Sequence, residues 1–239
     1  MSERFYCPDP PQAGRYRLGP DESRHLARVC RLGPGDRVEL FDGRGFATSA
    51  EIVRTTPTQT ELLAIGGPIV TFPPACPLVL ATAIPKGDRF DWLIEKATEL
   101  GVDRLIPVLA ERSVVVPRGS KLDRLRRSVI EASKQCRRAR LMELSEPVDW
   151  PEIVGRFPAS DRFLADPAGA HPSRWPALEC GRGMVLAVGP EGGFTADETG
   201  LARSAGWFPI RLGDHILRVE TAGLAVSAAL LARVPEGDG

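Results

Sequence analysis

Two short segments near the C-terminal end of the 239-residue chain carry residue types suited to holding a flat ligand with main-chain groups. The first, Gly189–Gly193, reads Gly-Pro-Glu-Gly-Gly and follows the apolar run Met184–Val188. The second, Leu212–Thr221, precedes another apolar run. A loop with three glycines in five residues lets a ligand approach the backbone closely, because no Cβ atom intervenes and positive φ angles are accessible. We therefore expect backbone N–H and C=O groups to bind a cofactor there.

A helix is expected directly after the first loop, since Thr195 and Glu198 have the spacing of a capping box. The order of strand, glycine loop and helix also occurs in phosphate-binding turns. The chain, however, has neither G-x-G-x-x-G after a strand nor G-x-x-x-x-G-K-[ST], so phosphate binding by this loop is disfavoured. Taken alone, the glycine loop is equally compatible with a simple tight turn, because Gly and Pro mark turns in most proteins.

Together with two further segments, these loops resemble the RsmE-type ribosomal RNA uridine-N3 methyltransferases of the SPOUT, or trefoil-knot, superfamily. The resemblance rests on Arg89–Gly101 (RFDWLIEKATELG), on Arg112 with Ser113, on Gly189–Phe194 and on Leu212–Ala222, in the family's order. It implies an α/β trefoil-knot methyltransferase domain preceded by a small, PUA-like β-barrel that binds RNA. It also implies S-adenosylmethionine as the cofactor, the 16S RNA of the small ribosomal subunit as substrate and partner, and a homodimer.

The resemblance also implies which residues contact the cofactor, on three loops of the C-terminal domain. They are Leu164, Asp166, Gly189, Pro190, Glu191, Gly192, Gly193, Leu212, Gly213, Ile216, Leu217, Arg218 and Thr221. One departure from the family pattern follows Lys134 and Gln135. A small-residue turn such as Ser-Gly-Arg is expected there, and this chain has Cys136-Arg137-Arg138.

Arg218 is the first candidate for the chemistry that the resemblance implies. Methyl transfer from a sulfonium is an in-line displacement, so a site must mainly place the nucleophilic nitrogen opposite the S–CH3 bond, and no metal is needed. Loss of the uridine N3 proton spreads negative charge over O2 and O4, which favours a nearby base or cation. A guanidinium can donate two hydrogen bonds to that edge and stays charged at any working pH. The alternative for Arg218 is a structural salt bridge to Glu191 or Glu220.

Glu191 and Glu220 are the candidate bases, and either one could instead fix its loop. For Glu220 we favour the structural role, because a carboxylate at the start of the last helix is well placed to accept free backbone N–H groups. Thr221 could be that cap, or could bind the methionine end of the cofactor. His215 is disfavoured as a base, since no residue that would orient it is visible in the sequence.

A concentration of positive charge marks residues 118–140. This segment contains nine basic and only two acidic residues, so its local net charge is +7. The basic residues are Arg118, Lys121, Arg124, Arg126, Arg127, Lys134, Arg137, Arg138 and Arg140. Leu122, Leu125, Val129, Ala132 and Cys136 recur at helical spacing, so one helix face should pack while the opposite face is charged. A solvated face would give the same pattern, and the resemblance makes RNA contact the preferred interpretation. The predicted RNA-binding residues are Arg24, Arg28, Arg31, Arg112, Arg124, Arg127, Lys134 and Arg138.

Composition narrows the class of protein. With 43% hydrophobic residues the chain can bury a core, and its 31 basic and 31 acidic residues balance, so RNA affinity must come from uneven charge placement. The five cysteines include no C-x-x-C pair, which argues against a disulfide framework and a zinc site. The N-terminus lacks signal-peptide features, and no apolar run approaches a bilayer-spanning length. We expect a cytoplasmic protein without a membrane partner.

The predicted elements fall into two domains, residues 1–72 and 73–239. The first is mostly strands, with a hairpin at Asp42-Gly43 between Arg37–Phe41 and Phe46–Val53 and one helix over residues 21–32. Prolines 73, 74 and 77 mark a linker. The second alternates strands and helices, as in a largely parallel sheet. Expected strands cover residues 78–84, 105–109, 163–165, 184–188 and 208–212, and expected helices cover 88–100 and 222–234. The last helix is apolar almost all round and should be buried between the sheet and another layer, with a second subunit as one candidate.

Three alternative functions remain open from the sequence. A trefoil-knot methyltransferase could act on another base or on transfer RNA, because the cofactor segments carry no information about the target base. A non-catalytic RNA-binding assembly factor could keep the fold without the reaction. A Rossmann-type methyltransferase fits poorly, because the glycine loop lies late in the domain and not after its first strand.

Overall fold

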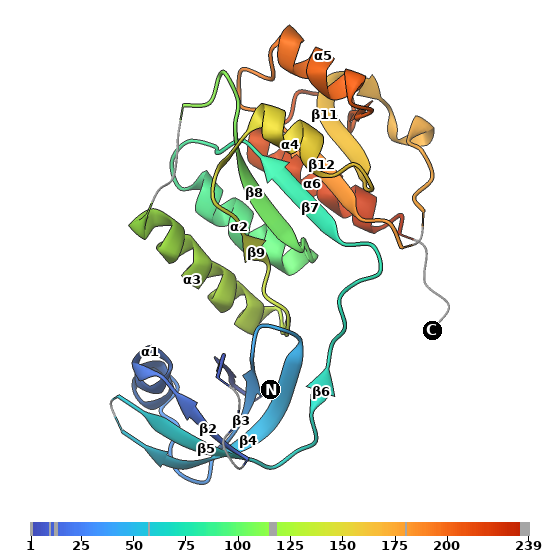
Figure 1. Cartoon of the computed structure of the whole chain (residues 1–239). Coiled ribbons are helices and arrows are strands. Elements are labelled where there is room, and N and C mark those ends of the chain that lie inside the picture. Colours follow the sequence, from blue (N-terminus) through green and yellow to red (C-terminus); the bar gives the residue numbers. More distant parts are fainter. Residues whose placement is uncertain are drawn as a thin grey trace. The chain divides into compact units, whose positions relative to one another are not determined.

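The computed structural model describes residues 2–9, 11, 14–56, 58–114, 119–179 and 181–234, and it divides into two compact units (Figure 1). The N-terminal unit comprises the chain up to Pro73 together with Ile130–Leu141, and the C-terminal unit comprises Pro74–Val129 and the chain from Met142 onward. The division at Pro73 falls in the proline-rich stretch in which the sequence predicts a linker. The sequence-based boundary at residue 72 had assigned Ile130–Leu141 to the second domain.

The N-terminal unit is built on a six-stranded sheet with the order β1-β3-β4-β5-β2 and β6 paired to β4. Its strands are β1 (Arg4–Tyr6), β2 (Arg15–Leu18), β3 (Arg37–Phe41), β4 (Phe46–Thr55), β5 (Thr60–Ala64) and β6 (Ile69–Val70). Only the β1/β3 pair is parallel. Apolar side chains that alternate along these strands, such as Leu40, Ile52 and Leu62, form a core in which each is at most 1% exposed.

The predicted hairpin at Asp42-Gly43 is confirmed, with β3 and β4 paired from Arg37 opposite Glu51 to Phe41 opposite Ala47. The Asp42 carboxylate accepts the N–H groups of Arg44 (2.7 Å) and Phe46 (3.0 Å), and Gly43 has a φ of 78°. A short polar side chain and a left-handed glycine are the chemistry that such a turn requires.

The predicted helix over residues 21–32 is present in two shorter parts. α1 (Pro20–Arg24) starts at a proline, whose fixed φ suits the first helical turn, and continues directly into the π-helical turn η1 (His25–Val29). The wider turn ends before Arg31, which has a φ of 56°. Leu26 faces the core and is fully buried, while Arg24 and Arg28 are exposed.

The C-terminal unit contains a seven-stranded sheet in which every pair is parallel, which confirms the predicted α/β class. The order is β10-β8-β7-β12-β11-β13, with β9 paired to β8. The strands are β7 (Leu78–Thr82), β8 (Arg104–Leu109), β9 (Glu143–Leu144), β10 (Val148–Asp149), β11 (Asp161–Ala170), β12 (Met184–Val188) and β13 (Phe208–Ile210). All five residues of β12 are buried, as expected for a central parallel strand covered on both faces.

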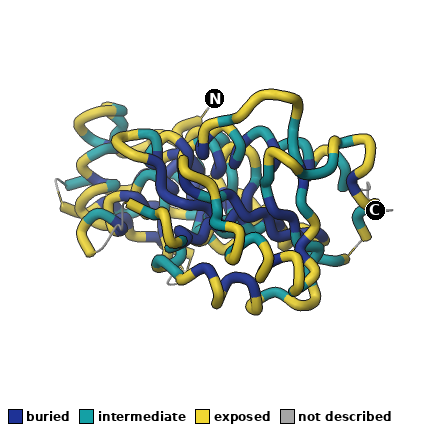
Figure 2. Tube along the Cα trace, turned by 90° about the horizontal axis from the view of Figure 1, so that it is seen from above, coloured by how far each residue is buried: buried dark blue, intermediate teal, exposed yellow. Residues whose placement is uncertain are grey.

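Helices cover both faces of this sheet (Figure 1). α2 (Arg89–Leu100) packs against α6 (Val219–Leu231), which lies on β7 and β12, while α4 (Trp150–Arg156) packs against α5 (Ala196–Ser204) and β8. The second layer expected over the last helix is therefore α2 of the same chain. A short 3-10 turn, η2 (Pro172–Arg174), follows β11. In Figure 2 the buried residues follow the inner segments and the exposed ones follow the outer turns.

The strand order brings three separate loops to one edge of the sheet. From β12 the chain passes through α5 and returns as β13, which lies on the far side of β11. The carboxyl ends of β11, β12 and β13 are therefore neighbours. In parallel sheets, ligands bind at such carboxyl ends where the strand order reverses. The two segments singled out from the sequence both leave the sheet at this edge.

The basic segment forms α3 (Ser120–Gln135). Four members of its predicted apolar stripe, Leu122, Leu125, Val129 and Ala132, are each at most 5% exposed, whereas the fifth, Cys136, follows the helix end and is half-buried. Arg118 lies outside the described residues, as does Cys180. The helix ends at Gln135, and Arg137 then takes a φ of 62°, a left-handed conformation that glycine adopts most easily. An ion pair from Arg137 to Glu39 holds this turn, which is the place where the chain departs from the family pattern.

Candidate functional site

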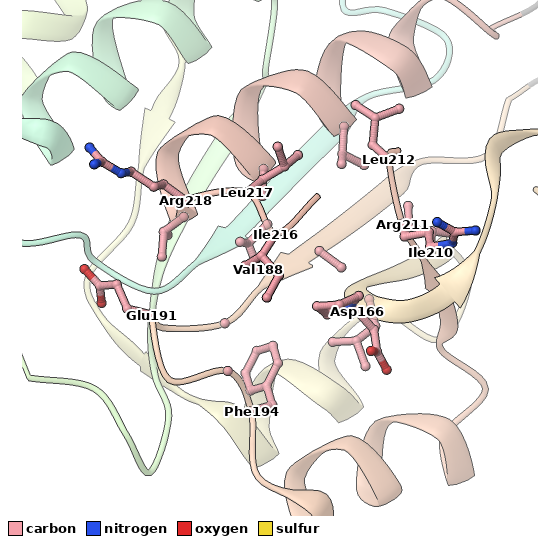
Figure 3. A pocket seen from close by; sticks show the side chains of 18 of the residues that line it. Asp166, Val188, Glu191, Phe194, Ile210, Arg211, Leu212, Ile216, Leu217 and Arg218 are labelled. Carbon is pink, nitrogen blue, oxygen red and sulfur yellow. The ribbon is translucent and has the colours of Figure 1, made fainter. Parts of the chain in front are cut away.

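A cavity of about 510 Å³ lies at the carboxyl edge of the parallel sheet, within the C-terminal unit (Figure 3). Every predicted cofactor-binding residue except Thr221 lines it: Leu164, Asp166, Gly189, Pro190, Glu191, Gly192, Gly193, Leu212, Gly213, Ile216, Leu217 and Arg218. The described part of the chain thus brings all three predicted loops together around one space. Thr221 is exposed and is not part of this lining.

The glycine loop after β12 is shaped by an aromatic contact. A Cβ atom on Gly189 would lie 2.9 Å from the ring of Phe194, so only glycine lets that ring fold back under the loop. The Phe194 ring stacks on Trp150 with centroids 4.1 Å apart, and Trp150 is 1% exposed. Gly193, with a φ of 69°, donates its N–H to the Pro190 carbonyl (2.8 Å) and closes the turn. The loop is therefore attached to the buried core of the α4/α5 face.

The predicted capping box at the start of α5 is confirmed. The Thr195 hydroxyl accepts the Glu198 N–H (3.3 Å), and the Glu198 carboxylate accepts the Thr195 N–H (2.8 Å). The other Glu198 oxygen accepts the Glu111 N–H (2.8 Å), which joins the loop after β8 to this helix start. Arg112, in that same loop, donates to the Gly192 carbonyl (2.6 Å). Arg112 was predicted to bind RNA, and the structure gives it a contact that supports the glycine loop.

The second loop, residues 211–218, lines the cavity and includes main-chain donors without a protein partner among the described residues. Gly213 has a φ of 77°, and its carbonyl accepts from Arg211 (2.9 Å), which also pairs with Asp214. Among the described residues, no hydrogen-bond acceptor is found for the N–H groups of Leu212 and Leu217. Because unpaired N–H groups inside a cavity call for a ligand or water, this loop is ready to bind polar atoms of a ligand.

A bulge in β11 forms the third wall. The pairing of β11 with β13 skips from Ala165 to Ala170, and a Cβ atom on Gly169 would lie 2.6 Å from the backbone of Ile210. Asp166 lies in this bulge, where its carboxylate accepts the Ala168 N–H (2.9 Å) and pairs with Arg203 of α5 (3.1 Å). The bulge turns the end of β11 so that Asp166 faces the cavity.

These features fit a cofactor that contains a nucleoside but no phosphate group. Leu164, Val188 and Val226 give the cavity apolar walls, and the glycines bring backbone N–H and C=O groups to its surface. Its volume is within the usual range for small-molecule sites, about 300–1,000 Å³. Among the described residues, no three His, Cys, Asp or Glu side chains gather in a way that would hold a metal ion.

Arg218 and Glu191 lie at the same end of the cavity, where both side chains are drawn at its left in Figure 3. Arg218 directly precedes α6, its side chain is exposed, and it forms no ion pair within the described part of the chain. The alternative role of Arg218, a salt bridge to Glu191 or Glu220, is therefore not what the structure contains. His215 also lines the cavity and is exposed.

Arg89 makes the contacts that the sequence analysis considered for Arg218. Its guanidinium lies 3.5 Å from the Glu220 carboxylate and 3.8 Å from that of Glu191, and its Nε donates to the Lys86 carbonyl (3.0 Å). Arg89 opens the Arg89–Gly101 segment on which the resemblance rests, but no role had been assigned to it. The only indication in the sequence of a further cation was that Glu191 and Glu220 had no assigned ion-pair partner.

Glu220 is buried and is not among the residues that line the cavity. Its side chain is 7% exposed, one oxygen faces Arg89, and the other has no hydrogen-bond partner among the described residues. The expectation that Glu220 caps α6 through backbone N–H groups was wrong, because its carboxylate is turned toward α2 instead. No side chain caps this helix start, so Thr221 is not the cap either.

The predicted RNA-binding residues have different surroundings. Arg24 pairs with Asp21 (2.8 Å) and Arg124 pairs with Asp91 (2.7 Å). Arg28, Arg31 and Arg127 are exposed and form no ion pair within the described residues, and Arg138 is half-buried. The Lys134 side chain is only 9% exposed, between the carboxylates of Glu22 and Glu131. Burial acts to lower the pKa of Lys134, but these carboxylates outweigh it and the pKa lies above the ordinary lysine value. We therefore assign Lys134 to the core of the N-terminal unit.

Comparison with known proteins agrees with this geometry. A family model described as an RNA methyltransferase domain matches residues 73–231, and one described as an RNA methyltransferase PUA domain matches residues 18–62. The chain is 34% identical over 208 residues to the ribosomal RNA small subunit methyltransferase E of Synechocystis, a match that covers 83% of this chain and 66% of that protein. It is 31% identical over 241 residues to the protein of the same name from Mycobacterium bovis, covering 95% of this chain and 90% of the relative.

A solved structure has the same arrangement over nearly its whole length. The ribosomal RNA small subunit methyltransferase E of Neisseria gonorrhoeae, crystallised with S-adenosyl methionine, superposes with a TM-score of 0.89 at 30% identity and covers 98% of both chains. The predicted resemblance is thereby confirmed. With a domain model matched along residues 73–231, this chain belongs to the RNA methyltransferase family and has the SPOUT α/β fold with an N-terminal PUA domain that its sequence predicts.

Proposed function

We propose that this chain transfers a methyl group from S-adenosylmethionine to N3 of a uridine in the 16S RNA of the small ribosomal subunit. The observation that carries the proposal is the cavity framed by three backbone-rich loops, whose lining includes Arg218, a residue without an ion pair among those that the structure describes. The relatives named for methylation of small-subunit ribosomal RNA support the substrate class, and the relative crystallised with S-adenosyl methionine supports the cofactor.

The residues that would hold the cofactor are those that line the cavity. Leu164, Val188 and Val226 would cover its apolar surface, and the free N–H groups of Leu212 and Leu217 would meet its polar edge. When bound, S-adenosylmethionine supplies an electrophilic methyl group on a positively charged sulfur. Because the Phe194 stack and the Arg112 contact already fix the glycine loop, little ordering would be required on binding.

Arg218 would act on the uracil. Its guanidinium is free of carboxylate partners among the described residues, so its full charge can face an incoming base. Hydrogen bonds from a cation to O2 or O4 stabilise the negative charge that develops as the N3 proton leaves, and they lower the pKa of that proton. A positioned cation of this kind contributes most in the transition state, where that charge is greatest.

Glu191 is the better placed of the two candidate bases. It lines the cavity beside Arg218, whereas the Glu220 carboxylate is buried outside the lining. We infer that Glu191 takes the N3 proton and that Glu220 serves to hold Arg89, which in turn lies beside Glu191. The three charged groups then form a chain that starts in α6 and ends at the mouth of the cavity.

Exposed, unpaired arginines would contact the RNA phosphates. Arg127 on α3 and Arg28 and Arg31 on the N-terminal unit meet this description among the residues that the structure describes. Arg124 is exposed too, but pairs with Asp91, so part of its charge is already compensated. Such contacts supply affinity and a salt dependence without reading the base sequence.

We also propose a homodimer and a cytoplasmic location, the compartment of the proposed substrate. The side chain of Ile216, at the tip of the second loop, is 86% exposed, and Trp92 on α2 is 48% exposed. Both are large apolar residues that are open to solvent, and Ile216 also lines the cavity. A second subunit would cover them. No described helix is both long and apolar enough to cross a bilayer.

The experiment that tests the proposed function is methyl transfer from labelled S-adenosylmethionine to purified small subunits that lack the modification, followed by nucleoside mass analysis. We expect 3-methyluridine. Label on another nucleoside, or on transfer RNA, would favour a different target base. Cofactor binding with no transfer to any RNA would favour a non-catalytic assembly factor.

Gly189→Ala tests the cradle that the cofactor would occupy. Its Cβ would meet the Phe194 ring at 2.9 Å and displace either the ring or the loop, so we expect affinity for S-adenosylmethionine to fall about tenfold. Gly200→Ala is the matched control, because its Cβ meets no atom within 4 Å and it lies in α5. Calorimetric titration measures both. Equal affinities for the two variants would show that the loop is not part of the cofactor site.

Arg218→Ala tests the charge at the mouth of the cavity. We expect kcat to fall about 100-fold or more while the cofactor Kd stays nearly unchanged, because the guanidinium acts on the developing uracil anion. Arg218→Lys keeps the charge but loses the paired donors, and should recover part of the rate. Single-turnover methyl transfer gives the rate. Undiminished turnover in Arg218→Ala would exclude the proposed role.

Arg127→Gln tests the RNA-binding face of α3. Removal of one phosphate contact should reduce the slope of log affinity against log salt by about 0.7–0.9 and leave cofactor affinity unaltered. Arg126→Gln is the control on the same helix, because Arg126 is already paired with Asp123 (3.1 Å) and Glu146 (2.8 Å). RNA binding at several salt concentrations measures the slope. An effect of equal size in both variants would indicate a general charge effect in place of a defined contact.

A further inference from the structure

The N-terminal unit contains a second cavity, of about 290 Å³, beside the β3/β4 hairpin. Three aromatic rings, those of Tyr16, Phe41 and Phe46, contribute to its walls together with Leu40. Its volume is at the lower end of the range for small-molecule sites, so it suits one flat ring and not a whole nucleoside cofactor. No step of the proposed methyl transfer uses this cavity.

Tyr16 places a polar group in this apolar space. The residue is 5% exposed, and its hydroxyl forms no hydrogen bond within the described part of the chain. The hydroxyl oxygen is not among the fully buried side-chain atoms that lack a hydrogen-bond partner, so it is partly accessible. Tyr16 is one of the residues that line the cavity. Burial raises the pKa of Tyr16, so the hydroxyl stays protonated and can donate at neutral pH. A hydroxyl that is open to the cavity and has no protein partner is available to a polar atom of a ligand.

Charged groups of both signs stand at the same cavity. Arg44 lines it, is exposed, and forms no ion pair within the described residues. Asp42 also lines it and uses one oxygen, Oδ1, for the N–H groups of Arg44 and Phe46, which leaves Oδ2 able to accept from a ligand. Arg140 donates to the Arg44 carbonyl and brings a second guanidinium to the hairpin. Asp9 also lines the cavity, so the set offers two carboxylates, a hydroxyl and a cation around an aromatic pocket.

We propose that this cavity binds one unstacked nucleobase of an RNA strand, with Arg44 on the adjoining phosphate. Aromatic and apolar walls cover the faces of a base, Asp42 accepts from a ring or amino N–H, and the Tyr16 hydroxyl meets the remaining polar edge. The inference rests on the proposed function in one respect, that the chain acts on RNA. Base binding here adds recognition of a second, unmethylated nucleotide to the contacts made at the methyl-transfer cavity.

Fluorine NMR on the full-length chain tests the proposal, because the sequence contains only two tyrosines, Tyr6 and Tyr16. Labelling with 3-fluorotyrosine gives two signals, which Tyr6→Phe assigns. Tyr6 is absent from the cavity lining, but its ring packs on Phe41 of the cavity wall with centroids 5.4 Å apart, so the test reads the Tyr16 signal alone. We expect a mixed-sequence single-stranded RNA to shift the Tyr16 signal and ribose 5-phosphate to leave it in place. Base binding would be overturned if saturating RNA left the Tyr16 signal unshifted, or if ribose 5-phosphate shifted that signal as much as RNA does.

Two variants and one control measure the energetic effect. Phe46→Ala removes a ring from the cavity wall and should weaken RNA binding about tenfold. Arg44→Gln should weaken it less and reduce the salt slope, whereas Arg37→Gln, an exposed residue of β3 outside the cavity, should change neither. Affinities equal to wild type for both Phe46→Ala and Arg44→Gln would contradict the proposal.

Methyl transfer by the same labelled preparation separates this inference from the proposed function. If ribosomal RNA is methylated while RNA leaves the Tyr16 signal unmoved, base binding in this cavity fails and the proposed function stands. If RNA moves the Tyr16 signal but no methyl group is transferred, the base site stands and the proposed function fails.

Discussion

The stack of Phe194 on Trp150 is the contact on which the geometry of the site depends. Gly189 has no side chain, so the Phe194 ring can lie beneath the loop, and Trp150 anchors that ring in the core. Trp150 in turn donates its indole N–H to the Glu198 carbonyl (3.1 Å), inside the capping box of α5. The glycine loop, the start of α5 and the core around Trp150 are thereby connected to one another. A loop held by a buried aromatic pair keeps its shape without a ligand, which reduces the entropy lost on binding.

Local signals in the sequence were sufficient for the elements but not for their arrangement. The capping box, the Asp42-Gly43 hairpin and the buried β12 each depend on residues close together in the chain, and each was predicted correctly. The order β12-β11-β13 and the bulge of β11 depend on contacts between distant segments, such as Gly169 against Ile210. No periodicity carries that information. The three cofactor loops could be brought together beforehand only through resemblance to a family.

The pairing of charged side chains likewise could not be predicted from the sequence. Sequence reasoning identified Arg218, Glu191 and Glu220 as a group, but it considered Arg218 alone as a possible ion-pair partner of the two carboxylates and did not find Arg89. Arg89 is more than 100 positions from Glu191 and Glu220 in the chain, and only the packing of α2 against α6 brings it between them. Because Arg89 pairs with both carboxylates, Arg218 is not required as their partner. A buried Glu220 without Arg89 would leave an uncompensated charge, so the pair is required for stability as well as for placement.

The balance of charge constrains how such a chain can select RNA. With equal numbers of acidic and basic residues, and several arginines of the predicted patch already paired to carboxylates, only a small set of cations is left for phosphates. Affinity from counterion release grows with the number of phosphates contacted, so this contribution must be modest here. Phosphate contacts also carry no sequence information. Under the proposed function, selection of one uridine has to come from groups that would bind bases: Arg218 at the cavity of the C-terminal unit and, by our inference, the aromatic cavity around Tyr16. Two base-binding cavities in one chain would compensate for weak electrostatics with specificity, because each correctly placed base adds stacking and hydrogen bonds that a random strand cannot supply.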